Sequence, residues 1–411
     1  MQVVHARCCG LDIHKKTVVA CVLLTQDDGT VQRHVRTFGT MTADLLALSD
    51  WLTRYEVTQI ALESTGVYWR PVFNILEEGR TLVLLNPQHI AKVPGRKTDV
   101  SDAEWIADLL RHGLLRASFV PPVAVRDLRE LTRYRKTLVT ERAAEVNRLQ
   151  KVLESANLKL ASVATDVLGA SGRAMLDAVL GGEADPSVLA DLARGRLRAK
   201  LPALQQALVG RVKPHHLIVI GQILAHIDFL DQAIDHLHTA IADASPPVEE
   251  AVALAQTVPG IKAVAAAALI AEIGADMSQF PSAKHLTSWV GVCPGNKQSG
   301  GRRLSGKTTK GNVWARAILG EVAWAAARTR GTYLSALFQR IARRRGKNKA
   351  IVAVAHSILV SLYYMLRDKR PYADLGADYF DHLDQARIER YHIKRLQQLG
   401  YTVSLAPKEA A

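Results

Sequence analysis

Residues 10–24, Gly-Leu-Asp-Ile-His-Lys-Lys-Thr-Val-Val-Ala-Cys-Val-Leu-Leu, decide the fold class of the N-terminal part of the chain. Residues 11–24 and 31–38 are rich in aliphatic and β-branched side chains, and Asp27, Asp28 and Gly29 between them favour a turn. We therefore predict two antiparallel strands, Leu11–Leu24 and Val31–Phe38. A β-hairpin then begins the first sheet.

The stretch that follows alternates short apolar runs with helical spacing, as is typical of a layered α/β domain. Strands are predicted over residues 59–63 and 81–85, and helices over 42–55 with Thr42 as N-cap, over 71–78 and over 98–112. Residues 1–120 are therefore assigned to one α/β domain.

Beyond Pro121 and Pro122 the sequence has helical patterns and no strand pattern. Apolar residues lie near a heptad seam in residues 128–153 and again in 217–241, which indicates two arms of a coiled-coil hairpin. Gly-Gly, Asp-Pro and Arg-rich pieces between the arms indicate a small helical insertion. The predicted division is a coiled-coil middle over 121–250, a helical C-terminal domain over 251–370 and a peripheral tail over 371–411.

The composition excludes a disordered chain and favours a nucleic-acid partner. Apolar residues make up 48% of the 411 residues and charged residues 22%, which are values of a globular protein. The net charge is +14, and an excess of this size indicates a polyanionic partner. The excess is local, because residues 295–350 contain 14 Lys or Arg and one acid, Glu321.

The cysteines and the lengths of the apolar runs indicate in which cellular compartment the protein is expected. The four cysteines form no CxxC pair and have no zinc-ligand spacing, so a reducing bacterial cytoplasm is expected. The N-terminus lacks the apolar core of a signal peptide, and the apolar runs at 263–271 and 351–355 are too short to span a bilayer. We expect neither a membrane association nor export.

Four carboxylates of the first domain form a candidate metal site. Asp12 lies on the first strand between apolar neighbours, and Glu63 ends the strand over 59–63. Asp99 and Asp102 are three residues apart at a helix start, which places them on one face. Such a set of oxygen donors suits two Mg²⁺ ions, which can activate the attacking oxygen and stabilise the leaving oxygen in phosphodiester cleavage.

Each acid also has an ordinary interpretation when it is taken singly. Asp99 is then a helix cap, Asp102 a first-turn acid favoured by the helix dipole, Glu63 a surface residue and Asp12 a locally hydrogen-bonded side chain. Lys97 precedes the paired acids and is either a phosphate contact or a solvated lysine.

The sequence Thr257-Val-Pro-Gly-Ile-Lys262, followed by an Ala-rich helix, resembles a helix-hairpin-helix element. In such an element the backbone N–H groups at the turn bind a DNA phosphate. Gly260 and Lys262 are the candidate contacts, and an ordinary capped helix is the alternative.

A glycine-rich stretch farther along contains a candidate nucleophile. Ser299 lies between Gln298 and the pair Gly300-Gly301, a setting suited to an exposed reactive hydroxyl. Four cations nearby in the sequence are suited to neutralising phosphate charge: Arg302, Arg303, Lys307 and Lys310. The alternative is a loop that contacts phosphate, in which the serine only donates a hydrogen bond.

A second basic run lies near the start of the last long helical stretch. Its cations are candidate contacts to a nucleic-acid backbone: Arg343, Arg344, Arg345, Lys347 and Lys349. A solvated basic helix end is the alternative.

The sequence resembles known proteins in two respects, and these resemblances include the acids and the serine described above. The order of strands and acids over the first 115 residues resembles the RNase H-like, RuvC-like nuclease fold with a DEDD quartet, carried by GLDIHKKTVVACVL, ALESTGVYW and GRKTDVSDAEWIADLLRHG. Residues 10–370 together, including the P-x-x-x-x-S-G element at 294–300, resemble the bacterial insertion-sequence transposases of the IS110 type and the related pilin-gene DNA invertases.

This resemblance implies an RNA-guided DNA transposase. Ser299 would attack DNA and form a phosphoserine link, and Asp12, Glu63, Asp99 and Asp102 of a neighbouring subunit would hold the metal. A noncoding bridge RNA would pair with donor and target DNA, and the protein would assemble as a dimer or a tetramer. Two other functions stay open: a RuvC-like nuclease or resolvase that uses an activated water, and an inert nucleic-acid-binding protein.

Overall fold

The computed structural model describes residues 2–64, 66–86, 101–295, 297–308, 310–383 and 385–405, without the side chains of 297–299, 303–305 and 385–388. The chain divides into two compact units, residues 1–121 and 122–411. Each unit has a hydrophobic core of its own. A sheet with covering helices forms the first unit, and helices dominate the second.

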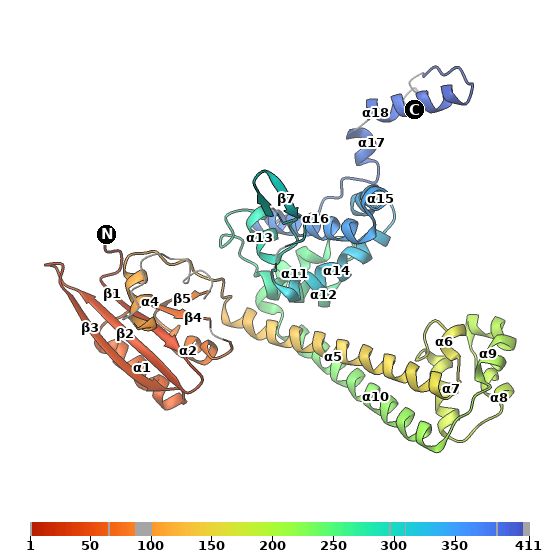
Figure 1. Ribbon diagram of the computed structural model, residues 1–411, viewed down its shortest axis with the longest axis horizontal. Coiled ribbons are helices and arrows are strands. Elements are labelled where there is room, and N and C mark those ends of the chain that lie inside the picture. Colours follow the sequence, from red (N-terminus) through yellow and green to blue (C-terminus); the bar gives the residue numbers. More distant parts are fainter. Residues whose placement is uncertain are drawn as a thin grey trace. The chain divides into compact units, whose positions relative to one another are not determined.

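The first unit contains a five-stranded mixed sheet in the order β3-β2-β1-β4-β5 (Figure 1). Three strands form an antiparallel meander, and β4 and β5 run parallel to β1. The strands are β1 (Arg7–Ile13), β2 (Thr17–Thr25), β3 (Val31–Gly39), β4 (Gln59–Glu63) and β5 (Thr81–Leu85). The strands predicted at 59–63 and 81–85 are thereby confirmed.

The predicted single strand Leu11–Leu24 is wrong, because this stretch contains most of two strands. His14, Lys15 and Lys16 are exposed and form the turn between β1 and β2. The backbone N–H of His14 donates a 2.8 Å hydrogen bond to the carbonyl oxygen of Thr17, which closes that turn. Three consecutive polar residues therefore interrupt the apolar alternation where the chain reverses.

Helices cover both faces of this sheet. The helices α1 (Thr42–Arg54) and α2 (Trp69–Leu76) contribute to a core with Leu11, Ile13 and other strand residues. The helix α4 (Asp102–Arg111) covers the opposite face, where Cys8 and Ala61 are buried. Thr42 is the first residue of α1 and the N-cap is Met41, which corrects the predicted cap by one position. Residues 98–100 of the predicted helix over 98–112 lie outside the described residues.

Two long helices, α5 (Val123–Ser155) and α10 (Pro214–Asp243), pack side by side in the second unit (Figure 1). They are antiparallel, because Leu138 near the middle of α5 meets Leu230 and Ile234, whereas Leu149 shares a core with Ile220. The two predicted helical arms thus exist as helices. Their assignment as a coiled coil stays a prediction.

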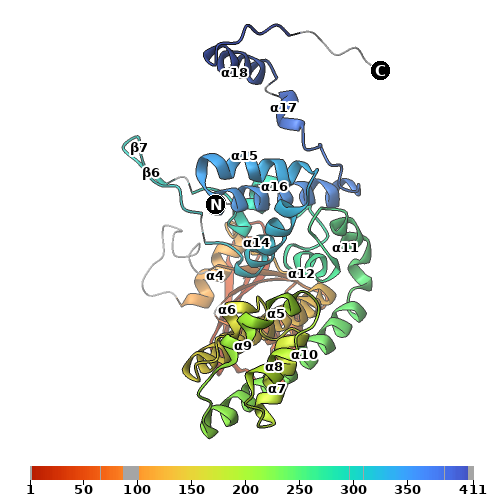
Figure 2. The same ribbon diagram turned by 90° about the vertical axis from the view of Figure 1, so that its right-hand side faces the viewer.

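Short helices pack on one end of this pair, which faces the viewer in Figure 2, and share one core with it. Leu149 and Leu153 of α5 and Leu224 of α10 are fully buried in that core. The elements are α6 (Leu160–Val163), α7 (Ala170–Leu180), α8 (Pro186–Asp191), η1 (Gly195–Lys200) and α9 (Leu201–Leu208).

A C-terminal lobe surrounds α16 (Lys347–Asp368), which packs on α11, α13, α14 and α15. The other elements of the lobe are η2 (Pro246–Val248), α11 (Glu249–Gln256), α12 (Ala263–Ile273), α13 (Ala283–Val290), α14 (Val313–Arg328) and α15 (Tyr333–Arg345). Two helices follow the lobe in the chain, α17 (Tyr379–Leu383) and α18 (Gln385–Gln398). The expectation of a purely helical lobe is wrong in one respect, because β6 (Lys297–Ser299) and β7 (Arg302–Ser305) form a hairpin.

The helices α10 and α16 are long and apolar enough to cross a membrane by length and composition alone. The sequence-based expectation considered only uninterrupted apolar runs; the run at 351–355 is a short part of α16, and none of the runs that it named lies in α10. In the structure α16 packs against four helices of the lobe and α10 packs against α5, which accounts for many of their apolar residues. All four cysteines are free thiols in the structure.

Candidate functional site

Asp12 and Glu63 lie next to each other at one edge of the sheet in the first unit. The parallel register pairs Leu11 of β1 with Leu62 of β4, so the following residues are Asp12 and Glu63. Leu11 and Leu62 are fully buried on the side of α1 and α2. Since side chains alternate along a strand, both acids belong to the opposite face, which α4 covers.

The helix α4 brings a third acid to the same edge. A Cβ on Gly10 would lie 2.2 Å from the carbonyl oxygen of Ala103 and 2.4 Å from the nitrogen of Ala107, so only glycine allows α4 to lie this close to β1. Cys8 Sγ lies 3.5 Å from the carbonyl oxygen of Ala107. The helix therefore runs opposite to β1, and its first residue, Asp102, lies toward the end of the strand that contains Asp12.

Local contacts hold the start of α4 and one of the acids. The Ser101 hydroxyl caps α4 by accepting a 3.3 Å hydrogen bond from the Glu104 N–H. Asp12 Oδ2 lies 3.2 Å from His14 Nε2, and the Asp12 side chain is 20% exposed, so solvent reaches it at the strand end.

The donor chemistry at this edge suits a hard divalent cation, because Asp12, Glu63 and Asp102 offer only carboxylate oxygens. Within the described part of the chain, no group of three or more His, Cys, Asp or Glu side chains is close enough together to hold a metal ion. The predicted fourth ligand, Asp99, and the predicted phosphate contact Lys97 lie outside the described residues. The four-acid cluster stays a prediction.

Ser299 is the last residue of β6 and directly precedes the turn of the β6–β7 hairpin. Gly300 and Gly301 form this turn with φ values of 55° and 74°, a conformation that glycine adopts readily. The register pairs Ser299 with Arg302 and Gln298 with Arg303. The structure thus replaces the predicted loop by a hairpin. The side chains of Ser299 and Arg303 are outside the described ones, and Arg302 is exposed.

Close backbone contacts fix the base of this hairpin. The Gly295 N–H donates a 3.0 Å hydrogen bond to the carbonyl oxygen of Lys307, and a Cβ on Gly295 would lie 2.2 Å from that oxygen. A Cβ on Gly311 would lie 2.2 Å from the carbonyl oxygen of Val290, the last residue of α13. The two arms are therefore joined at their base, and the C-terminal arm is tied to α13 of the lobe.

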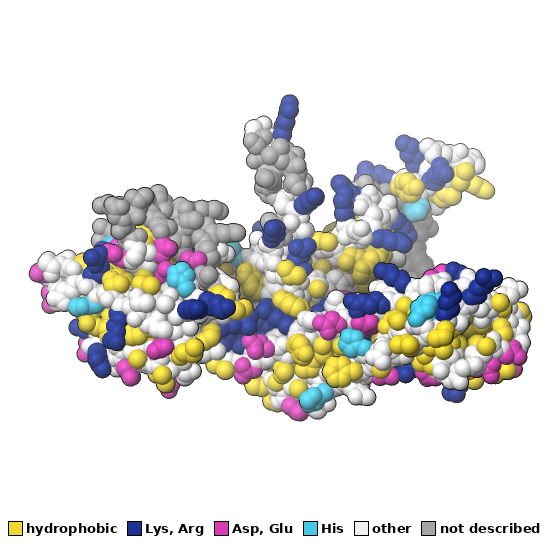
Figure 3. Space-filling model, turned by 60° about the horizontal axis from the view of Figure 1, so that its bottom comes forward, with side chains coloured by type: hydrophobic (Ala, Val, Ile, Leu, Met, Phe, Trp, Pro, Cys, Tyr) yellow, Lys and Arg dark blue, Asp and Glu magenta, His cyan; other side chains and the backbone are white. Residues whose placement is uncertain are grey.

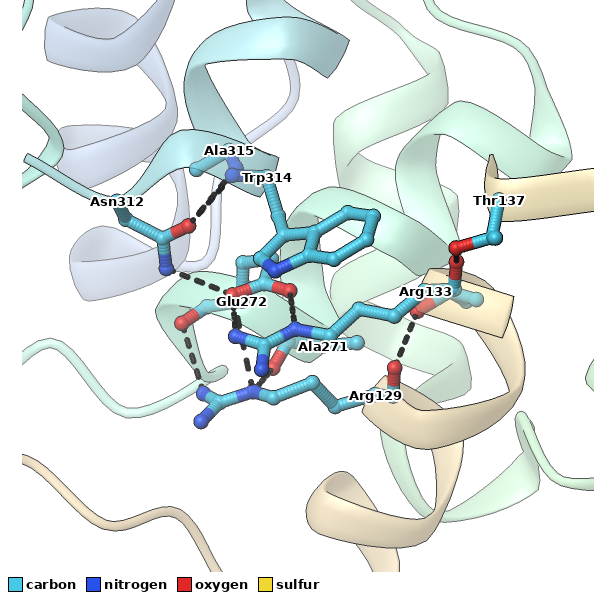
Figure 4. A network of polar contacts seen from close by, with 9 residues as sticks. Arg129, Arg133, Thr137, Ala271, Glu272, Asn312, Trp314 and Ala315 are labelled. Carbon is cyan, nitrogen blue, oxygen red and sulfur yellow. Dashed lines mark hydrogen bonds and ion pairs between the residues drawn. The ribbon is translucent and has the colours of Figure 1, made fainter. Parts of the chain in front are cut away.

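Asn312 follows the hairpin and links it to a buried ionic network (Figure 4). Its Oδ1 accepts 3.0 Å hydrogen bonds from the N–H groups of Trp314 and Ala315, which caps α14. Its Nδ2 donates a 2.6 Å hydrogen bond to Oε2 of Glu272, a side chain that is only 1% exposed. The cap of α14 thus depends on the same residue that contacts a buried carboxylate.

Two arginines of α5 neutralise Glu272. Arg133 donates from Nε at 2.6 Å and from Nη2 at 2.8 Å to its two carboxylate oxygens. Arg129 donates to the carbonyl oxygens of Ala271 and Glu272 at 2.8 and 2.9 Å. Sequence reasoning did not find this network, although Glu272 is the only charged residue of the apolar helix α12 and a buried charge requires a partner.

The predicted helix-hairpin-helix corresponds to α11, the connection over 257–262 and α12. Gly260 has a φ of 89°, and a Cβ there would lie 2.6 Å from the nitrogen of Ala326 and 2.9 Å from the carbonyl oxygen of Val322. Packing against α14 therefore requires this glycine. Lys262 is exposed at the N-cap of α12. Contact of either residue with DNA stays a prediction.

The predicted backbone contacts of the second basic run are exposed around one helix junction. The run ends α15 with Arg343, Arg344 and Arg345, turns at Gly346 with a φ of 83°, and begins α16 with Lys347. All its cations, including Lys349, are exposed, as are Lys307 and Lys310 below the hairpin. Figure 3 shows Lys and Arg side chains exposed at several places on one face of the molecule.

The chain is similar to known transposases over most of its length. Residues 9–158 match a family of DEDD-type IS110 proteins described as transposase, and residues 252–339 match a family described as transposase IS116/IS110/IS902. Together these matches include Asp12, Glu63, Asp99, Asp102 and Ser299.

Three known proteins are similar in sequence. The transposase for insertion sequence element IS1111A of Coxiella burnetii is 26% identical over 301 residues, which cover 70% of this chain and 72% of the relative. A probable family 20 transposase of Pseudomonas aeruginosa is 27% identical over 320 residues, or 75% of this chain and 83% of the relative. A pilin gene-inverting protein of Moraxella bovis is 29% identical over 152 residues, which cover 34% of this chain and 44% of the relative.

Proposed function

Because the chain belongs to the IS110 family of transposases and is thus a DNA transposase, we propose that it cuts and rejoins DNA through a covalent bond between Ser299 and a DNA phosphate. The element it moves is an insertion sequence. The observation that carries the proposal is the position of Ser299, which directly precedes the turn of a hairpin and is paired in register with Arg302.

The hairpin suits a nucleophile that must enter DNA. A two-residue turn with positive φ at both glycines narrows the tip of the hairpin and keeps bulky side chains away from its end. Arg302 is exposed and lies opposite Ser299 in the register, so its guanidinium can neutralise the phosphate that the serine attacks. The contact of Gly295 with Lys307 joins the two arms at the base of the hairpin, and the contact of Gly311 with Val290 ties its C-terminal end to α13.

The reaction conserves phosphodiester bonds. Ser299 Oγ forms a bond to phosphorus and loses its proton, while the bond from phosphorus to one sugar oxygen breaks and that oxygen gains a proton. The free sugar hydroxyl of another strand then attacks the phosphoserine, which restores Ser299 and rejoins DNA. No nucleotide cofactor is needed, because the protein–DNA bond keeps the energy of the broken linkage.

The DEDD domain is suited to assisting this step with a divalent metal ion, proposed as a pair of Mg²⁺ ions. When bound, such ions stabilise charge on the attacking and leaving oxygens. Asp12, Glu63, Asp99 and Asp102 are the proposed ligands, and the proposed fold of their domain is RNase H-like. The sheet order β3-β2-β1-β4-β5 and the placement of Asp12 beside Glu63 support this assignment.

The nucleic acids are proposed to be donor DNA, target DNA and a noncoding bridge RNA that selects both by base pairing. The local excess of Lys and Arg over residues 295–350 supports binding of such polyanions. We further propose that two or four copies assemble, so that the acids of one subunit act with Ser299 of another. The antiparallel helices α5 and α10 are the proposed coiled-coil contact.

The experiment uses the full chain, transcripts of the DNA that flanks its coding region, and end-labelled duplexes carrying the element ends and the target. After denaturation, label that stays with the protein reports a covalent adduct. Ser299→Ala should abolish the adduct, whereas Ser305→Ala, the other serine of the hairpin, should retain it. Strand cleavage by the Ser299→Ala variant without an adduct would overturn the proposal and indicate a nuclease that uses water.

A further inference from the structure

A cavity of about 230 Å³ lies at the foot of α5, where this helix meets α12 and α14. Four cations line it. Three of them come from one turn of α5: Arg133, Arg135 and Lys136. The fourth is Lys262, the N-cap residue of α12. Trp314, Glu272 and Glu321 also line the cavity. Sequence reasoning singled out only Lys262 among these cations.

The charges of this cavity do not cancel. Arg133 is neutralised by Glu272 through two hydrogen bonds. Lys136 forms an ion pair with Glu321. Arg135 and Lys262 form no ion pair with a carboxylate within the described part of the chain, although Glu321 acts on Arg135 electrostatically. An excess of two positive charges therefore faces a space that has room for one phosphate group and part of its sugar.

The Nε–H group of Arg135 is a buried hydrogen-bond donor without an acceptor in the described part of the protein. Its Nε atom is buried and has no hydrogen-bond partner among the described residues. Burial lowers the pKa of the Arg135 guanidinium, since desolvation disfavours its charge. Buried N–H groups of native proteins are almost always hydrogen-bonded, so this donor is available to an acceptor from outside the chain, such as water or a phosphate oxygen.

The start of α12 contributes further donors to the same cavity. Lys262 is its N-cap and makes no side-chain cap, so the N–H groups of the first turn have no side-chain acceptor from that residue. Val264 and Ala265 of this first turn line the cavity. The indole of Trp314, whose ring centre lies 5.5 Å from the Arg133 guanidinium carbon, forms an apolar wall.

We propose that this cavity binds one phosphodiester of a nucleic-acid strand, with Arg135, Lys262 and the first turn of α12 as its donors and Trp314 as the wall against which the sugar or base rests. The ligand class rests on the proposed function, since a transposase acts on nucleic acid. The site is separate from the Ser299 hairpin, and it joins the arm formed by α5 to the lobe that carries the hairpin. A strand held there spans the junction of these two parts.

The test measures affinity for 20-nucleotide probes of one sequence, as single-stranded DNA, duplex DNA and single-stranded RNA, over a range of salt concentrations. Arg135→Gln and Lys262→Gln should each lower affinity about tenfold at 0.1 M salt and reduce the salt slope by about one unit for the strand that occupies the cavity. Glu321→Gln should raise affinity for the same probe, because it removes the carboxylate that competes for Lys136. The affected probe identifies the strand as DNA or RNA.

The controls separate binding from folding and from the serine reaction. Lys151→Gln removes an exposed charge from the same helix, about 24 Å from Arg135 along the helix axis, and it should leave the salt slope unchanged. Arg135→Gln should unfold at the same temperature as the parent or higher, because it removes an unpartnered buried donor. Ser299→Ala should bind with the parent slope even though it forms no adduct, so a failure of the serine mechanism leaves this result intact. Parent affinity and slope in both Arg135→Gln and Lys262→Gln, for every probe, would overturn the proposal.

Discussion

The side chain of Asn312 donates a 2.6 Å hydrogen bond to the buried carboxylate of Glu272 while it caps α14 with its other amide atom. Because Arg133 of α5 binds the same carboxylate, the residue that ends the hairpin segment and the foot of the long arm share one buried anion. A displacement of α5 would therefore alter the contacts of Glu272, including its hydrogen bond with Asn312 at the start of α14. The N-cap residue of α14 and the helix α5 thus contact the same side chain, Glu272.

Breaking this network should destabilise the second unit more than breaking an exposed ion pair does. Arg133→Ala leaves Glu272, which is 1% exposed, without its two-point partner, and the expected loss is about 3 kcal/mol. Arg142→Ala breaks the pair with Asp231, whose side chain is 45% exposed, and should cost about 1 kcal/mol or less. Hydrogen-exchange protection of the α12 amides measures both losses. Equal protection in the two variants would contradict the role of Glu272.

Gly10 should be intolerant of a methyl group. Gly10→Ala places a Cβ against the backbone of Ala103 and Ala107, so α4 must move away from β1 at a cost of about 1–3 kcal/mol. Gly320→Ala in α14, where nothing lies within 4 Å of the added Cβ, should stabilise by up to about 1 kcal/mol. Hydrogen exchange in α4 and α14 reports the two changes. Full protection of α4 in Gly10→Ala would disprove the close packing.

The sequence predicts local structure well where one pattern dominates. The strands at 59–63 and 81–85 are short apolar runs between polar turns, and their observed bounds are the same. The boundary between β1 and β2 was missed, because Leu11–Leu24 looks like one β-rich run unless the exposed residues 14–16 are taken as a turn. The β6–β7 hairpin was missed because its strands are three and four residues long and consist mostly of polar residues.

The residues of the candidate sites likewise fall into two groups, those that the sequence predicts and those that it does not. The position of Asp12 beside Glu63 follows from strand order, so the acids could be chosen from the sequence before their register was known. The pairing of Arg133 with Glu272 joins residues 139 positions apart, and no local pattern carries such a contact. The lone charge in α12 was the available signal, since a buried carboxylate requires a partner.

The turn of the hairpin should control the serine reaction without controlling the fold. Gly300 has a φ of 55°, and a Cβ added there would meet open space, so only backbone conformation limits its replacement. Gly300→Val should lower the yield of protein–DNA adduct about tenfold, since a β-branched residue resists this conformation by about 1–2 kcal/mol. Gly300→Asn should lose much less. Both variants should unfold at the same temperature as the parent protein. Equal adduct yields in the two variants would contradict the role of the turn.

Removal of an acid at the sheet edge should separate binding from chemistry. Asp12→Asn keeps the size of the side chain and removes its charge, so adduct formation should fall at least a hundredfold while affinity for DNA stays within about twofold. Asp27→Asn, in the exposed turn between β2 and β3, should leave both unchanged. A chelator should reproduce the effect of Asp12→Asn in the parent protein. Full adduct formation by Asp12→Asn would exclude the acid from the reaction.

The central claim is that Ser299 itself carries the DNA, and mass spectrometry of the adduct tests it most directly. Trypsin cleavage after Lys297 and Arg302 releases residues 298–302, in which Ser299 is the only hydroxyl residue. After nuclease digestion of the bound strand, this peptide should carry the mass of a nucleotide attached through phosphate, and it should be unmodified when DNA is omitted. A nucleotide found on another peptide, or an adduct that persists in Ser299→Ala, would contradict the account.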